Sequence, residues 1–192
     1  MKVKNILLVA VVTASTLAGQ AYAGDWYTGL DATNLSYDVK FSNSNETYDL
    51  NPLRFKVGYI GDSGFGAELQ LLGSGEGSTI DGGGSPFQTE SKTSWGLSGI
   101  WSSTNEKHGL YGSLGILSLD TTYTDQTTTT RSDTDSVMLT SLGLGYYVHV
   151  SDNLKLTIDY TTMSGDAAYS TFSTTDVDVK MSGFGLGVSY VF

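Results

Sequence analysis

Alternation of apolar and polar residues, repeated along most of the sequence, is the feature that most constrains the fold. In residues 53–59, 65–71, 154–160 and 184–190, every second side chain is apolar and those between are polar or glycine. Successive side chains of a β-strand point to opposite faces, so each segment is expected to be a strand with one apolar face. With 24 glycines and only two prolines, the composition suits short strands joined by turns better than a helical bundle.

The first 23 residues are expected to be a cleaved signal peptide. Lys2 and Lys4 precede an apolar run over residues 6–12, and Ala21-Tyr22-Ala23 has the A-x-A pattern of a signal-peptidase site. This run is much shorter than the roughly 20 residues that a spanning helix needs, so cleavage is favoured over an N-terminal membrane anchor. The mature protein is then one domain over residues 24–192.

The charge balance excludes one class of partner. The whole chain has a formal net charge of -10, and removing the two lysines of the signal peptide leaves eight basic against twenty acidic residues, or -12. Nucleic-acid binding is not expected, because contact with phosphates needs a basic surface. The absence of cysteine excludes disulfides, thiolate metal sites and a cysteine nucleophile.

The connections between strands indicate which all-β fold is present. Alternation alone fits a soluble sandwich equally well, but the gaps between the predicted strands are alternately short and long. Eight antiparallel strands with short periplasmic turns and four long extracellular loops are typical of a transmembrane β-barrel of the outer membrane. The predicted strands lie near 26–36, 49–60, 65–73, 91–101, 110–119, 137–150, 154–162 and 178–192, and the long loops near 37–48, 74–90, 120–136 and 163–177.

The C-terminal strand carries the most specific local signal. Phe184, Leu186, Val188, Tyr190 and Phe192 share one face, and the chain printed here ends on the aromatic residue. This pattern resembles the C-terminal recognition strand that the outer-membrane barrel assembly machinery reads. The alternative is an ordinary edge strand that ends on Phe by chance.

Aromatic residues on the apolar face gather at the predicted short-turn ends of the strands. Amphipathic rings at these positions are expected to form a girdle at the level of the lipid headgroups. The predicted girdle residues are Trp26, Tyr59, Phe65, Trp101, Tyr146, Tyr190 and Phe192.

Over residues 24–192 the chain resembles the small OmpA/OmpX-type barrels of the outer membrane protein β-barrel domain family. The resemblance rests on the rhythm of strands and loops, on glycine-spaced strands such as 111–115 and 141–146, and on the Phe192 ending. It implies an outer-membrane location, contact with membrane lipid and lipopolysaccharide, and passage through the assembly machinery. We also expect a monomer.

Charged residues are expected inside the barrel, because they occupy the polar face of the strands. An eight-stranded barrel has an interior that side chains nearly fill, and buried charges are tolerated only when they are paired. We therefore predict a plug of paired charges rather than an open channel, with Asp31, Lys56 and Glu68 at about the same height. The full set is Asp31, Arg54, Lys56, Glu68, Lys155 and Asp159.

Catalysis, a metal site and a cofactor are not expected. His149 and Ser151 form an H-x-S pair that superficially resembles the pair of outer-membrane lipid A deacylases. However, Ser151 falls in a Ser-Asp-Asn turn of ordinary composition, and no carboxylate is evidently placed to orient the histidine. His108 lies in a polar segment and is expected to be a solvated turn residue.

Any specific function is expected to lie in the long loops, which are rich in Thr, Ser and Gly. We expect a structural or surface-interaction role through contact of the loops with a host or matrix ligand, as in adhesin-like barrels, with cations bridging the acidic side chains as one route. The alternative for the loops is that they are merely hydrophilic and variable. A narrow pore for small solutes is the alternative, followed by a lipid-acting enzyme. The acidic loop residues are Asp81, Asp125, Asp133, Asp135, Asp166 and Asp176.

Overall fold

The structure is a computed structural model. The structure describes residues 24–40, 45–80, 87–91, 93–103, 107–125, 131–167 and 177–192. The predicted signal peptide, residues 1–23, lies outside these ranges. No helix in the described part of the chain is long and apolar enough to cross a membrane.

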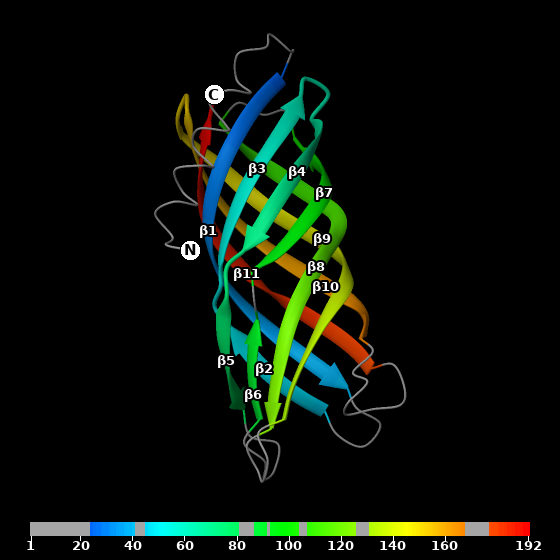
Figure 1. The fold of residues 1–192 in the computed structure, drawn as a ribbon. Coiled ribbons are helices and arrows are strands. Elements are labelled where there is room, and N and C mark those ends of the chain that lie inside the picture. Colours follow the sequence, from blue (N-terminus) through cyan, green and yellow to red (C-terminus); the bar gives the residue numbers. More distant parts are fainter. Residues whose placement is uncertain are drawn as a thin grey trace.

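The described residues form a closed, antiparallel β-barrel with eight strands in its wall (Figure 1). Three wall strands are built from two successive segments each: β2 with β3, β4 with β5, and β6 with β7. The barrel closes because β11 pairs with β1 along their full common length, from Tyr27 opposite Val191 to Lys40 opposite Asp178. The segments are β1 Gly24–Lys40, β2 Asn45–Leu50, β3 Leu53–Gly61, β4 Phe65–Leu72, β5 Gly75–Ile80, β6 Phe87–Ser91, β7 Ser94–Ser102, β8 His108–Asp125, β9 Arg131–Ser151, β10 Leu154–Ala167 and β11 Val177–Val191.

The break between β2 and β3 occurs at a proline. Pro52 has no N–H to donate to a neighbouring strand. Its carbonyl oxygen still accepts two hydrogen bonds from Thr33 on β1, at 3.2 Å from the backbone N–H and 2.6 Å from the hydroxyl. The wall therefore stays closed across the break.

Several predicted strands were too short at their long-loop ends. The sequence suggested strands ending near residues 36 and 119 and one starting near 137, whereas β1 continues to Lys40, β8 to Asp125 and β9 begins at Arg131. The β8–β9 ladder is paired up to Asp125 opposite Arg131. Much of the predicted loops 37–48 and 120–136 is therefore wall. Figure 1 shows β8 and β9 reaching the end of the barrel opposite the short β3–β4 turn.

The outward face of the wall changes character along the barrel axis. On β11 the outward side chains from Tyr190 to Phe184 are apolar and exposed, whereas those beyond them are the half-buried Ser182 and the exposed, charged Lys180 and Asp178. On β10 the apolar outward residues likewise end at Tyr160. The apolar part matches the band that faces lipid in a transmembrane barrel. We call the part of the wall beyond this band, toward the long loops, the extension.

The inward face changes in the opposite sense at the same height. Within the apolar band the interior holds mostly polar and charged side chains, with a small apolar cluster of Tyr27, Ile100 and Val191 near the short turns, and within the extension it holds a continuous apolar core. The wall thus has the polarity of a membrane barrel in one half and of a water-soluble β-protein in the other. The core of the extension consists of Leu35, Tyr37, Val39, Tyr48, Leu50, Leu72, Leu117, Leu119, Val137, Leu139, Met163, Val179 and Met181.

Aromatic side chains ring the short-turn end as the sequence predicted. The rings of Trp26 and Tyr59 lie 5.2 Å apart, and those of Tyr190 and Phe192 lie 5.1 Å apart in an edge-on contact. Such rings mark the membrane interface, because they combine an apolar body with a polar tip. They place the short turns on one side of the membrane.

Candidate functional site

The predicted charges meet inside the apolar band, and Arg54 is at the centre of their contacts. Its guanidinium contacts Asp31 at 2.6 Å through Nη2 and 2.8 Å through Nε. It also forms an ion pair with Asp159 from β10. The hydroxyl of Tyr111 on β8 donates a hydrogen bond of 2.7 Å to the Asp159 carboxylate. One arginine therefore links β3 to the neighbouring β1 and, across the lumen, to β10, and through Tyr111 this network reaches β8.

Of the other three charges, Lys56 joins this cluster, whereas Glu68 and Lys155 contact Tyr27. Lys56 forms an ion pair with Asp31 at 2.8 Å. Glu68 accepts a hydrogen bond of 2.5 Å from the Tyr27 hydroxyl. Lys155 lies over the Tyr27 ring, with its Nζ 4.4 Å from the ring centroid. The lumen thus holds an ion-paired cluster and, nearer the short turns, a lysine packed on an aromatic ring.

The register explains why Arg54 is the centre. Asp31 lies directly opposite Arg54 across the β1–β3 ladder, whereas Lys56 lies opposite Gly29. Glu68 lies opposite Gly58 on the β3–β4 ladder. We expected Asp31, Lys56 and Glu68 at about the same height. In the structure Arg54, and not Lys56, lies at the height of Asp31.

Glycines on β11 make room for the cluster. A Cβ atom at Gly187 would overlap the Asp31 carboxylate, and one at Gly185 would lie 2.8 Å from Arg54 Nη2 and 2.9 Å from Asp159 Oδ1. Any larger residue would have to displace a charged group from its partner. These two glycines are therefore requirements of the charge cluster.

Two layers of side chains fill the described lumen. The spaces between the charged residues measure about 20 and 10 Å³, each no larger than about one water molecule requires. Beyond them, toward the long loops, lies the apolar core of the extension, in which Tyr37, Leu117 and Leu139 are completely buried. An ion would have to displace both layers to pass.

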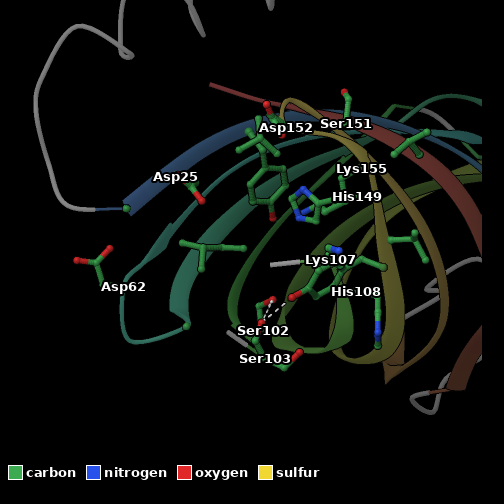
Figure 2. A pocket seen from close by; sticks show the side chains of 18 of the residues that line it. Asp25, Asp62, Ser102, Ser103, Lys107, His108, His149, Ser151, Asp152 and Lys155 are labelled. Atoms are coloured by element: carbon green, nitrogen blue, oxygen red, sulfur yellow. Dashed lines mark hydrogen bonds between the residues drawn. The ribbon is translucent and has the colours of Figure 1, made fainter. Parts of the chain in front are cut away.

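The short-turn end, in contrast, is hollow. A vestibule of about 880 Å³ lies between the ends of β1, β3, β7, β8, β9, β10 and β11. Figure 2 shows Lys155 and His149 inside it, with Asp25, Asp62 and Asp152 nearer its edge. This cavity could not be predicted from the sequence, because its size depends on how the short turns fold over the mouth of the barrel.

The two histidines lie at this end, and their contacts with the described residues form no catalytic arrangement. The ring of His149 packs edge-on against Tyr147, with centroids 5.5 Å apart, and Ser151 is exposed at its turn. His108 starts β8, is exposed, and lies 5.9 Å from the Tyr146 ring. The described residues contain no group of three or more His, Asp or Glu placed to hold a metal ion.

Comparisons with known proteins agree with this architecture. The sequence model of the outer membrane protein beta-barrel domain matches residues 6–192. None of the curated protein sequences compared matches the chain significantly.

Solved structures with a similar fold include several outer-membrane proteins. Neisserial surface protein A (NspA) has a TM-score of 0.63 at 15% identity, over 87% of this chain and 97% of its own. OprG from Pseudomonas aeruginosa has a TM-score of 0.58 at 17% identity, over 88% and 96%. Ail, the attachment invasion locus protein of Yersinia pestis, solved with the heparin analogue sucrose octasulfate, has a TM-score of 0.57 at 17% identity, over 89% and 100%. At these identities the likeness shows the fold alone.

Proposed function

The chain belongs to the outer membrane protein β-barrel domain family, and from that premise we propose that it acts by binding at its long-loop end, without catalysis. In this proposal the band of exposed apolar side chains holds the protein in the outer membrane. The extension stands beyond the membrane and presents the binding surface. The partner is a host or matrix ligand.

The reversal of polarity between band and extension is the observation that carries this proposal. A strand that merely crosses a membrane has no need of an apolar interior beyond the lipid. In the extension, the inward Leu35 and Tyr37 are buried, while the outward Asp38 and Lys40 face away from the core. Burial of an apolar core stabilises a fixed shape in water. The extension is thus suited to hold a preorganised surface, which favours binding by reducing its entropic cost.

The charges on the outside of the extension suggest the chemistry of the partner. Among its described outward side chains, acidic residues outnumber basic ones by five to two. A surface of this kind attracts basic patches on a partner and repels anionic polymers. The acidic residues are Asp38, Asp49, Asp120, Asp166 and Asp178, and the basic ones are Lys40 and Lys180.

Among the similar structures, the protein described as an attachment invasion locus protein gives a precedent for surface contact on this fold. That protein was solved with a sulfated, anionic ligand. The acidic extension of the present chain favours a ligand of the opposite charge. We therefore propose a basic protein surface as the partner class.

Asp166 and Asp178 provide the sharpest test, because they lie opposite each other on the β10–β11 ladder and both are exposed. The protein in nanodiscs of zwitterionic lipid should bind a lysine-rich peptide in preference to a glutamate-rich peptide of equal length. The double variant Asp166→Asn/Asp178→Asn should bind it several-fold more weakly. Asp152→Asn, at the opposite end, is the matched control and should bind like the unchanged protein.

Equal binding of both peptides would contradict the proposed partner chemistry. A loss of binding in Asp152→Asn but not in the double variant would place the binding surface at the short-turn end and contradict the proposal. Raised salt should weaken the specific binding, since exposed charges are screened.

A further inference from the structure

The vestibule at the short-turn end has a second, deeper compartment. An inner pocket of about 20 Å³ lies on its lumen side, and Tyr27, Tyr147 and Lys155 line both spaces. Lys155 therefore lies where the vestibule meets the inner pocket. The short-turn end of such barrels faces the periplasm, so this route starts from the periplasm and is independent of the extension.

Lys155 differs from the other two cations of the lumen. Arg54 and Lys56 form ion pairs with aspartates, whereas no carboxylate of the described residues lies within ion-pair distance of Lys155. Its Nζ lies 4.4 Å from the centroid of the Tyr27 ring and 5.6 Å from that of Tyr147. Ring faces stabilise an ammonium group but accept no strong hydrogen bonds, so its donors remain available to an anion.

Two hydroxyl groups without partners line the same inner pocket. Ser189 lies directly opposite Lys155 on the β10–β11 ladder, and Thr157 follows Lys155 by two residues on the same face. Their side-chain oxygens are buried and have no hydrogen-bond partner among the described residues. Buried hydroxyls are normally hydrogen-bonded, because an unmade bond is costly. A ligand that accepts hydrogen bonds would satisfy both groups.

We propose that this vestibule is a binding site for a small periplasmic molecule that carries one carboxylate. One carboxylate oxygen enters the inner pocket and accepts hydrogen bonds from Lys155 and from the hydroxyls of Ser189 and Thr157. The rest of the molecule lies in the vestibule, which has about 880 Å³ of space. A charged acceptor facing a buried cation gives the stronger type of hydrogen bond.

Size and charge favour a carboxylate over a phosphate. The inner pocket has room for about one oxygen atom of a ligand. Glu68 also lines the inner pocket, and its carboxylate accepts a hydrogen bond from the Tyr27 hydroxyl. A second negative charge on the ligand would be repelled by Glu68. A carboxylate, with one negative charge, is therefore repelled less by Glu68 than a phosphate with two.

The test compares two probes that differ only in the acid group. Isotope-labelled protein purified from outer membranes and placed in nanodiscs is titrated with N-acetylglycine and with N-acetylglycinamide, and NMR shifts are followed at Lys155 and Ser189. N-acetylglycine should give saturable shifts. The apparent affinity of the neutral amide should be weaker by about tenfold, equivalent to about 1.4 kcal/mol. Inorganic phosphate should bind more weakly than N-acetylglycine.

Variants connect these shifts to the site. Lys155→Gln should abolish the saturable shifts, and Ser189→Ala should weaken N-acetylglycine binding several-fold while leaving the barrel folded. Lys180→Gln removes an exposed lysine from the extension and should bind like the unchanged protein. Equal shifts with the neutral amide, tighter binding of phosphate, or unchanged binding in both Lys155→Gln and Ser189→Ala would overturn the proposal.

Discussion

Gly187 lies directly opposite Asp31 across the β1–β11 ladder, and a Cβ atom at Gly187 would overlap the Asp31 carboxylate. Asp31 is completely buried and carries the ion pairs with both Arg54 and Lys56. The smallest residue on one strand thus fixes the position of the carboxylate on the next. This contact connects a glycine of the C-terminal strand to the stability of the whole lumen.

Gly187→Ala should lower the free energy of unfolding by about 1–3 kcal/mol, the usual cost of forcing extra volume into a packed interior. Urea unfolding in detergent, followed by the gel mobility of the folded and unfolded forms, measures the change. Gly99→Ala is the matched control, because a Cβ there would come no closer than 3.8 Å to its nearest neighbour. Equal stability of the two variants would contradict the role assigned to Gly187.

Arg54→Met should destabilise the barrel more than Lys56→Met. Loss of Arg54 removes ion pairs from both Asp31 and Asp159, whereas loss of Lys56 leaves Asp31 paired with Arg54. Breaking a buried pair costs about 3–5 kcal/mol, and we expect the arginine variant in that range. Adding Asp159→Asn to Arg54→Met should recover part of the loss, because contacting residues couple. A larger loss for Lys56→Met would mean that Arg54 is not the centre of the cluster.

Phe192→Asp should reduce the amount of folded protein in the outer membrane. The Phe192 N–H donates a hydrogen bond of 2.9 Å to the Trp26 carbonyl, and its ring packs on Tyr190. A carboxylate at this position would lie at the membrane interface. It would also change the last residue of the predicted assembly signal, which consists of Phe184, Leu186, Val188, Tyr190 and Phe192. Fractionation of cells, with Phe192→Tyr as control, measures the effect through the mobility shift between unheated and boiled samples. Unchanged surface levels would argue against the assembly signal.

The intact protein should give no steady conductance in a planar lipid bilayer. The ion-paired cluster and the apolar core of the extension both block the lumen, and transfer of an ion through apolar surroundings is very costly. Arg54→Met should not open a steady pore, because the apolar core remains. A stable conductance from the unchanged protein would support the pore alternative.

The sequence predicted the faces of the strands well, because the side-chain period of a strand is two in any environment. The closed barrel and its eight-strand wall are confirmed. The strand ends were predicted less well, because the strands stay paired beyond the point where their outward residues change from apolar to polar. Tyr37 and Val39 continue the alternation of β1 on its inward face. The sequence signal for the extension was therefore a change in which face of the strand is apolar, from the outward face to the inward face.

The partners of the charges could not be predicted from the sequence alone. Parity places Arg54 and Lys56 on the same face, but only the register of β3 against β1 determines which of them lies opposite Asp31. The contact of Lys155 with Tyr27 depends on the reach of a long side chain. The vestibule depends on turn geometry, for which alternation carries no information.

Hydrogen exchange of the backbone amides in lipid tests most directly whether the extension is a folded part of the wall. Leu139 lies in the apolar core of the extension, and Leu144 lies in the lipid-facing band of the same strand, β9. Protection reports local opening, so a paired, apolar-cored wall predicts that the Leu139 amide exchanges about as slowly as the Leu144 amide. Exchange of Leu139 at the rate of an unprotected loop, with Leu144 still protected, would contradict the account.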